Sequence, residues 1–147
     1  MEPVIGEPAP SFSLPSTGGG KVALSEFKGK KNVVLYFYPK DDTPGCTVEA
    51  CSFRDALKDL DDTDTVVLGV SADDAESHAA FAAKYALPFT LLTDKEGRAA
   101  KSYGAWNDEK GRCNRVTAVI DKDGILRGYF PSVKPEGHAR EILAILR

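Results

Sequence analysis

The feature that most constrains the fold is an uninterrupted apolar run from Val33 to Tyr38, early in a chain of 147 residues. Apolar residues in a row, without the alternation of a half-exposed strand, are typical of a strand covered on both faces of a sheet. Val66 to Val70 is a second run of this kind. Because helical patterns follow both runs, the chain is expected to form an α/β sandwich around a mixed sheet.

The other elements are predicted from turn residues and hydrophobic spacing. Short strands are expected at 11–14 and 22–24, on either side of a glycine-rich turn, and further strands at 88–93, 116–120 and 125–130. The last two are expected to form a hairpin, because an Asp-Gly pair separates them. Helices are expected at 44–60, 75–85, 97–103 and 135–146. Since no repeat or linker divides the sequence, we expect one domain spanning residues 1–147.

Composition and charge argue against several classes of function. The net charge of −3 provides no electrostatic reason to bind nucleic acid or an anionic membrane. No apolar run approaches the ~20 residues that a membrane-spanning helix requires. The N-terminal residues lack the basic start and apolar core of a secretory signal. Three cysteines are too few, and odd in number, for a disulfide scaffold, so a reducing cytoplasm is expected.

Cys46 is the strongest candidate for chemistry. The apolar strand stops at Pro39, the chain turns through polar residues, and a helix is predicted to start at Pro44 with Thr43 as its N-cap. A thiol in the first helical turn faces unpaired backbone N–H groups and the positive end of the helix dipole, which favour the reactive thiolate. The alternative is a small buried apolar residue. The polar neighbours favour a reactive thiol that is at least partly open to solvent.

Cys51 follows five residues later on the same predicted helix. In an intact helix, Cα atoms five residues apart lie roughly 8 to 9 Å from each other, beyond the ~7 Å limit for a disulfide. The two cysteines can therefore bond only if the first turns unwind, which favours a switch over a permanent crosslink. Core packing is the alternative role of Cys51. The C-x-x-C pattern of disulfide reductases is absent, and the cysteines and histidines lack zinc-site spacing.

Four other residues receive less specific interpretations. Cys113 lies in a polar, basic stretch where neighbouring arginines would lower its pKa, although an incidental thiol at a strand entry is the preferred interpretation. His78 and His138 fall in predicted helices and are interpreted as structural or solvated side chains. Trp106 is interpreted as a packing residue beside the site.

Around these residues the sequence resembles the peroxiredoxins, and among them the peroxiredoxin Q group, also called bacterioferritin comigratory protein. Pro39, Thr43 and Cys46 match the signature P-x-x-x-T-x-x-C. The resemblance implies a thioredoxin-like fold with an N-terminal β-hairpin extension. It also implies reduction of hydrogen peroxide and organic hydroperoxides by a peroxidatic cysteine, Cys46, with no metal or organic cofactor.

The resemblance also assigns roles to five further residues. Thr43 and Arg115 match the groups that orient and stabilise the thiolate and the peroxide oxygens, and Pro39 matches the residue that shields the site. Cys51 matches the resolving cysteine of members that keep both thiols in one helix, and Glu49 is expected to hold the arginine. One departure concerns the segment between Trp106 and Arg115, which is shorter here than in many bacterial members.

The expected partners are a hydroperoxide substrate and thioredoxin or a similar dithiol that restores both thiols, and the chain is expected to be monomeric. Two alternatives stay open at this point. One is a general thiol–disulfide oxidoreductase on the same fold. The other is a non-enzymatic binding module with a thioredoxin fold and incidental cysteines.

Overall fold

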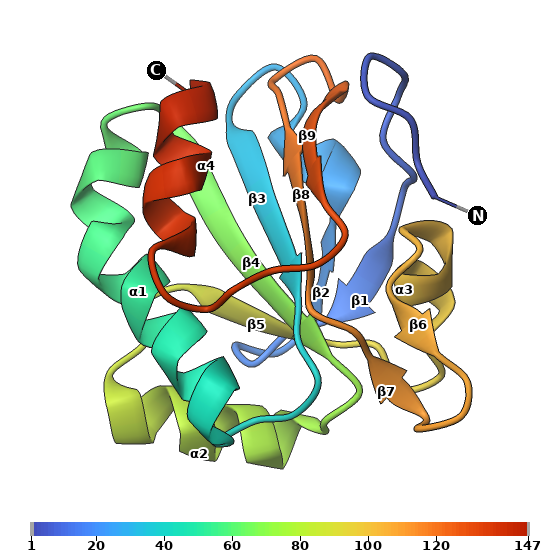
Figure 1. The fold of residues 1–147 in the computed structure, drawn as a ribbon, viewed down its shortest axis with the longest axis vertical. Coiled ribbons are helices and arrows are strands. Elements are labelled where there is room, and N and C mark those ends of the chain that lie inside the picture. The colour runs from blue at the N-terminus through green and yellow to red at the C-terminus, as the bar shows by residue number, and fades with distance from the viewer. Residues whose placement is uncertain (1, 147) are drawn as a thin grey trace.

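A five-stranded mixed sheet, in the order β5-β4-β3-β8-β9, forms the centre of the computed structural model, which describes residues 2–146 (Figure 1). β3, β4 and β5 run parallel, whereas β8 is antiparallel to both β3 and β9. The bounds of the strands are Asn32–Phe37 for β3, Thr65–Ser71 for β4, Thr90–Thr93 for β5, Val116–Ile120 for β8 and Leu126–Phe130 for β9. The central position of β3 explains its uninterrupted apolar run, because it is covered on both faces.

Three helices cover one face of the sheet (Figure 1). They are α1 (Pro44–Asp61), α2 (Ala75–Tyr85) and α4 (His138–Leu146). Side chains of β3 alternate between the two faces, as in any strand. Val34, Tyr36 and Tyr38 therefore pack in the buried cluster beneath these helices, and Cys46 belongs to the same cluster.

Smaller elements cover the opposite face, where Val33, Leu35 and Phe37 of β3 pack. The bounds of these elements are Ser13–Pro15 for β1, Lys21–Ala23 for β2, Leu24–Phe27 for the 3-10 helix η1, Arg98–Ser102 for α3, Trp106–Asn107 for β6 and Arg112–Cys113 for β7. β1 and β2 form the expected N-terminal hairpin. The buried surface on both sides fixes the sheet as the middle layer of a sandwich.

Most predicted elements are present with small shifts of their ends. Residues 75–85 and 116–120 form a helix and a strand with those bounds, and the helix predicted at 44–60 ends one residue later. The last helix begins at His138 and not at residue 135, because Gly137 has a φ of +74° and interrupts the helical conformation. The sequence does not predict the two-residue strands β6 and β7 or the helix η1, since segments this short carry no measurable periodicity.

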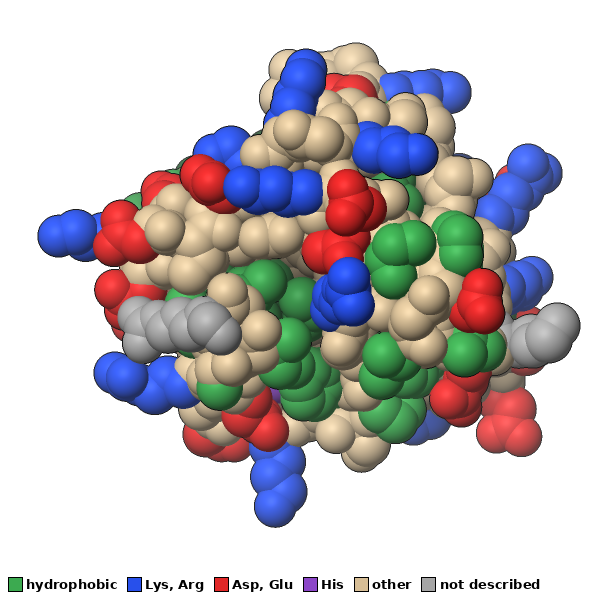
Figure 2. All heavy atoms as spheres, turned by 90° about the horizontal axis from the view of Figure 1, so that it is seen from above, with side chains coloured by type: hydrophobic (Ala, Val, Ile, Leu, Met, Phe, Trp, Pro, Cys, Tyr) green, Lys and Arg blue, Asp and Glu red, His purple; other side chains and the backbone are tan. Residues whose placement is uncertain are grey.

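The described helices include none with both the length and the apolar composition that crossing a bilayer would require. At the end of the molecule opposite the first turn of α1, Lys and Arg side chains are interspersed with Asp and Glu side chains around apolar ones (Figure 2). Such mixed charge is typical of a solvated surface.

Candidate active site

The end of β3 and the start of α1 together position Cys46. β3 ends at Phe37, and a short loop leads to Pro44, which occupies the first helical position, where a missing N–H costs nothing. The first intrahelical bond of α1 runs from the N–H of Thr47 to the carbonyl of Thr43, at 2.8 Å. The N–H groups of Gly45 and Cys46 precede this bond and have no carbonyl partner within the helix. Cys46 thus sits at the positive end of α1.

Arg115 joins this helix end from the strand side, just before β8. Its Nη1 lies 3.6 Å from the Cys46 sulfur and donates to Oε1 of Glu49 at 2.9 Å. The approach depends on Gly45, because a Cβ there would come within 2.9 Å of Arg115 Nη2. Burial lowers the pKa of Arg115, but Cys46 and Glu49 more than offset this and raise it above its ordinary value. The guanidinium is therefore a permanent positive charge beside the sulfur.

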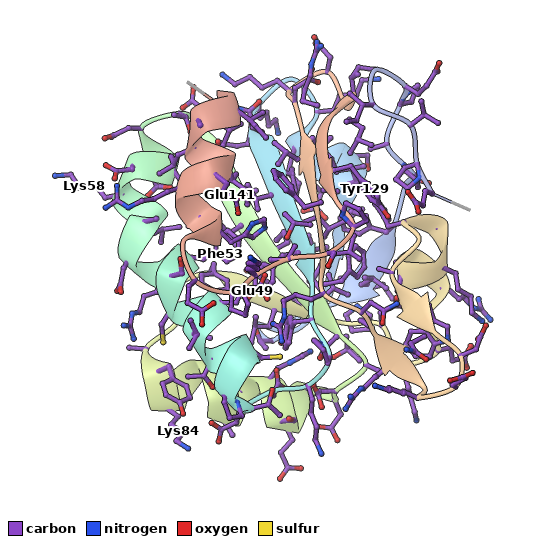
Figure 3. The ribbon with its side chains drawn as sticks, in the orientation of Figure 1. Glu49, Phe53, Lys58, Lys84, Tyr129 and Glu141 are labelled. Atoms are coloured by element: carbon purple, nitrogen blue, oxygen red, sulfur yellow. The ribbon has the colours of Figure 1, made fainter. Side chains whose placement is uncertain are left out.

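Glu49 is the most electrostatically unusual residue of the site. Its side chain points from α1 toward the sheet, one turn before Phe53 (Figure 3). The second carboxylate oxygen, Oε2, is buried and has no hydrogen-bond partner among residues 2–146. The same holds for the hydroxyl of Tyr36, which lies in the buried cluster beneath the helices. Burial raises the pKa of Glu49 to about 7, although Arg115 opposes the shift. Glu49 therefore changes its charge close to neutral pH.

The expectation that Cys46 is partly open to solvent is wrong for this structure, in which only 1% of the residue is exposed. The polar neighbours form the rim and not an opening: Pro44 is exposed, whereas Thr43 and Gly45 are half-buried. Pro135, from the segment before α4, lies 3.7 Å from the position of a Cβ on Gly45 and helps to cover the first turn. Polar residues in the sequence thus indicate a surface loop but not the cover that tertiary packing adds.

Thr43 occupies the N-cap position as predicted, but its side chain makes no capping bond. The hydroxyl donates to the carbonyl of Lys40 at 2.8 Å. The hydroxyl hydrogen is thus used within the loop, and the oxygen is left to accept a hydrogen bond from a ligand. Pro39 is half-buried just beyond the end of β3, four residues before the N-cap.

Cys51 lies half-buried on α1, and the helix continues without a break from Pro44 to Asp61. All three cysteines are free thiols, as Cys46 and Cys51 must be while the helix is whole.

Cys113 does not have the environment that its polar neighbours predict. It is 1% exposed, and burial raises the pKa of its thiol far above the ordinary value, with Asp94 and Asp73 adding to the effect. It pairs with Trp106 across β6 and β7, on the face of the sheet opposite Cys46. The prediction of a lowered pKa for Cys113 is wrong. Trp106 is a packing residue, but it lies on that other face and not beside the Cys46 thiol.

Both histidines are buried, so the interpretation of their side chains as solvated is wrong. Sequence reasoning misses the contacts of His78: its Nδ1 lies 2.7 Å from Oδ2 of Asp41, which the sequence indicates only as a polar turn residue. Possible metal-binding atoms lie within 4.8 Å of one another in Asp41, Asp73 and His78. Because these groups already hydrogen-bond to protein partners, the arrangement favours a buried polar network over a metal site.

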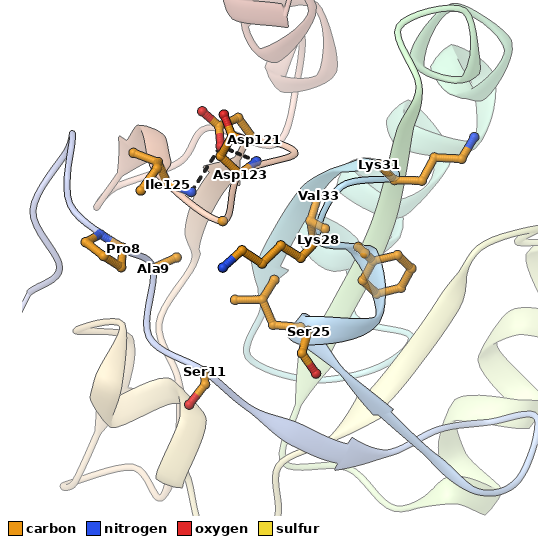
Figure 4. A pocket seen from close by; sticks show the side chains of 13 residues that line it. Pro8, Ala9, Ser11, Ser25, Lys28, Lys31, Val33, Asp121, Asp123 and Ile125 are labelled. Carbon is orange, nitrogen blue, oxygen red and sulfur yellow. Dashed lines mark hydrogen bonds between the residues drawn. The ribbon is translucent and has the colours of Figure 1, made fainter.

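A cavity of about 330 Å³ lies at the far end of the sheet from Cys46, near the start of β3 (Figure 4). Its walls include Lys28, Val33 and the turn from Asp121 to Ile125, where the Asp121 carboxylate accepts from two backbone N–H groups. Cys46 follows the opposite end of β3, so this cavity takes no part in the candidate active site.

Comparisons with known proteins agree with this geometry. Residues 5–129 match the AhpC/TSA family. The putative peroxiredoxin bcp of Coxiella burnetii is 46% identical, with 97% of each chain covered. Among solved structures, peroxidoxin BcpB of Mycobacterium tuberculosis has a TM-score of 0.91 at 35% identity and covers 97% of this chain and 96% of its own. Bacterioferritin comigratory protein of Xanthomonas campestris, studied for alkyl peroxide reduction activity, has a TM-score of 0.85 at 32% identity, covering 92% and 89%.

The sheet is thioredoxin-like, and a cysteine at the start of a helix lies beside a half-buried arginine. Together with these relatives, this arrangement defines the class of thiol-dependent peroxidases. The chain belongs to the AhpC/TSA family, in its Bcp or peroxiredoxin Q group. The resemblance and the thioredoxin-like fold stated from the sequence are thereby confirmed.

Proposed function

We propose that Cys46 is the peroxidatic thiol of this enzyme and Cys51 its resolving thiol, in the reduction of hydrogen peroxide and organic hydroperoxides. One observation carries the proposal. The guanidinium of Arg115 lies between the Cys46 sulfur, at 3.6 Å, and the carboxylate of Glu49, at 2.9 Å, at the end of α1 where N–H groups are free. Fixed donors around a sulfur are what a thiolate and a departing oxygen require.

In the first step, the Cys46 thiolate attacks the terminal oxygen of the hydroperoxide and the O–O bond breaks. The terminal OH stays on sulfur as a sulfenic acid, and the second oxygen leaves with the electron pair and takes a proton from water, which yields water or an alcohol. Arg115 stabilises the negative charge as it moves from sulfur to oxygen. The Thr43 oxygen accepts the hydrogen bond of the terminal O–H, and Pro39 shields the reacting atoms.

In the second step, the Cys51 thiol attacks the sulfenic sulfur, a disulfide forms and water leaves. The continuous helix between the two cysteines prevents this bond, so the first turns of α1 must unwind. Unwinding at a helix end costs least, because the terminal backbone groups make few intrahelical bonds. Thioredoxin or a similar dithiol then restores both thiols by exchange.

The relative from Xanthomonas campestris has alkyl peroxide reduction activity, which makes the same substrate class reasonable for this chain. We further propose that the chain acts as a single-domain monomer in a reducing cytoplasm, as its few free cysteines suggest.

The test is the intact mass and peptide map of the protein after one equivalent of peroxide. The parent protein is expected to lose two hydrogens and to contain a Cys46–Cys51 disulfide. Cys46→Ser abolishes peroxide consumption, and Cys51→Ser allows one stoichiometric oxidation but no efficient turnover with a dithiol. Cys113→Ser is the matched control, with turnover unchanged. Full turnover in Cys51→Ser would refute the assigned resolving role, and peroxide consumption by Cys46→Ser would refute the proposal as a whole.

A further inference from the structure

The loop between β3 and α1 is held by a buried carboxylate that the proposed chemistry does not use. Asp41 is 6% exposed. Its Oδ1 accepts from the Tyr38 hydroxyl at 2.5 Å, and its Oδ2 accepts from the Ser77 hydroxyl at 2.9 Å and lies 2.7 Å from Nδ1 of His78. A carboxylate with this many partners in the core is fixed in position.

His78 is the centre of this arrangement because it links two elements. Nδ1 faces the carboxylate of Asp41, and Nε2 lies 3.0 Å from the carbonyl oxygen of Leu92 in β5. Both partners are acceptors, so satisfying both ring nitrogens requires a hydrogen on each. Through His78, the loop is tied to the sheet and to the first turn of α2 at once.

Two further aspartates, Asp73 and Asp42, add contacts that hold the same loop. The backbone N–H of Asp41 donates to Asp73 at 2.8 Å. Asp42 has a φ of +56°, an uncommon conformation for a residue with a side chain, and its carboxylate accepts from Lys84 and Tyr85 at the other end of α2. Two consecutive aspartates therefore fasten the loop to both ends of α2.

The fastened loop leads directly into the active site. Asp41 is two residues before Thr43, and the Thr43 hydroxyl is oriented by the carbonyl of Lys40 within the same loop. The segment that must unwind for disulfide formation begins only after Thr43, at Pro44. The loop is thus the part of the site that can stay in place while α1 opens.

We propose that His78 is a positioning residue for the peroxide step: through Asp41 it holds the loop of residues 39–43 so that the Thr43 oxygen meets the terminal O–H of the peroxide. The inference rests on the proposed function and adds a residue to it. It predicts a loss specific to peroxides, because an alkylating agent such as iodoacetamide offers Thr43 no O–H to orient.

Two substitutions of His78 separate the contributions of its two ring nitrogens. Asn places its amide nitrogen near the position of Nδ1, so His78→Asn keeps a donor to Asp41 and loses the bond to Leu92. Gln places its nitrogen near the position of Nε2, so His78→Gln keeps the Leu92 bond and loses the bond to Asp41. His138→Gln is the matched control, since it also replaces a buried histidine and keeps a donor to its own partner, Thr117.

The experiment measures, in a Cys51→Ser background, the rates at which hydrogen peroxide and iodoacetamide modify Cys46, both by mass spectrometry. His78→Gln is expected to lower the ratio of the peroxide rate to the iodoacetamide rate by about 10- to 100-fold. His78→Asn is expected to lower it by about fivefold at most, and His138→Gln to leave it unchanged. A merely structural role would change both rates together and leave the ratio of every variant at the parent value.

An unchanged ratio in His78→Gln, or an equal fall in His78→Asn, overturns the inference. If neither variant folds, Ser77→Ala provides the test of the inference. Ser77 is half-buried, and its hydroxyl contributes one donor to Asp41. The ratio is then expected to fall about threefold, and an unchanged ratio overturns the inference. Failure of peroxide to oxidise Cys46 in the Cys51→Ser parent would instead refute the proposed function, and the two failures are therefore distinguishable.

Discussion

Replacing Glu49 by Gln should make the stability of the protein much less dependent on pH. The pKa of Glu49 is about 7 in the folded chain, against an ordinary value of 4.5. Each factor of ten in a proton-binding constant is about 1.4 kcal/mol, so burial, with Arg115 opposing it, disfavours the ionised form in the folded chain by a net ~3 kcal/mol. The Gln side chain has the shape of protonated Glu49 and carries no charge at any pH.

The sign follows from which state holds the proton. Between about pH 4.5 and about pH 7, folded Glu49 keeps a proton that the unfolded chain has already released, so the free energy of unfolding falls as pH rises. The contribution is fully present below the lower value and lost above the higher one. The stability of Glu49→Gln relative to the parent protein should therefore increase by about 3 kcal/mol from about pH 4.5 to about pH 8.5.

Urea unfolding of the reduced proteins at a series of pH values measures this difference, and comparison with the parent cancels the titration of all other groups. Glu109→Gln, at an exposed position, is the matched control and should show no such trend. If the difference in stability between Glu49→Gln and the parent is the same at both ends of the pH range, Glu49 does not titrate near neutral pH. The argument that burial raises its pKa would then be refuted.

Three further predictions follow from single contacts. Arg115→Gln removes the charge 3.6 Å from the peroxidatic sulfur and should slow sulfur oxidation about 100- to 1,000-fold in stopped-flow experiments; a change below about tenfold would contradict the role of the guanidinium. Gly97→Ala should lower the free energy of unfolding by more than about 2 kcal/mol, because φ is +74° and the new Cβ would overlap the Trp106 ring. Gly111→Ala, with φ +62° and no atom within 4 Å, should show the backbone strain alone, about 1 kcal/mol, and an equal loss in both variants would refute the steric argument. Cys113 should react with iodoacetamide only after unfolding in concentrated urea, because burial raises the pKa of its thiol, so rapid labelling of Cys113 in the native protein would contradict the raised pKa.

Much of the fold can be predicted because its strongest signals are local. The apolar run of β3 indicates a strand covered on both faces, and the turn residues around Thr43 and Pro44 indicate where α1 begins. The two-residue strands β6 and β7 escape prediction because their pairing depends on the packing of Trp106 and Cys113. The prediction for Cys113 is wrong for the same reason: its neighbours in sequence are polar, but its neighbours in space are apolar.

In the candidate site, too, some features can be predicted from local sequence and others depend on the folded structure. The match of Pro39, Thr43 and Cys46 to a known signature, with Arg115 assigned by the wider resemblance, names the participants without their arrangement. The burial of Cys46 and the network around His78 come from contacts between segments distant in the chain. Such contacts leave no trace in local composition.

The amino-acid sequence by itself determined the order of strands and helices and placed a thiol at the start of α1, because backbone preferences and hydrophobic spacing act over a few residues. Only the tertiary structure brought the guanidinium of Arg115 to Cys46 across 69 residues of chain, and only it enclosed Glu49 in the core. The electrostatics of the site depend on distance in space and on exclusion of water, and both are properties of the packed molecule.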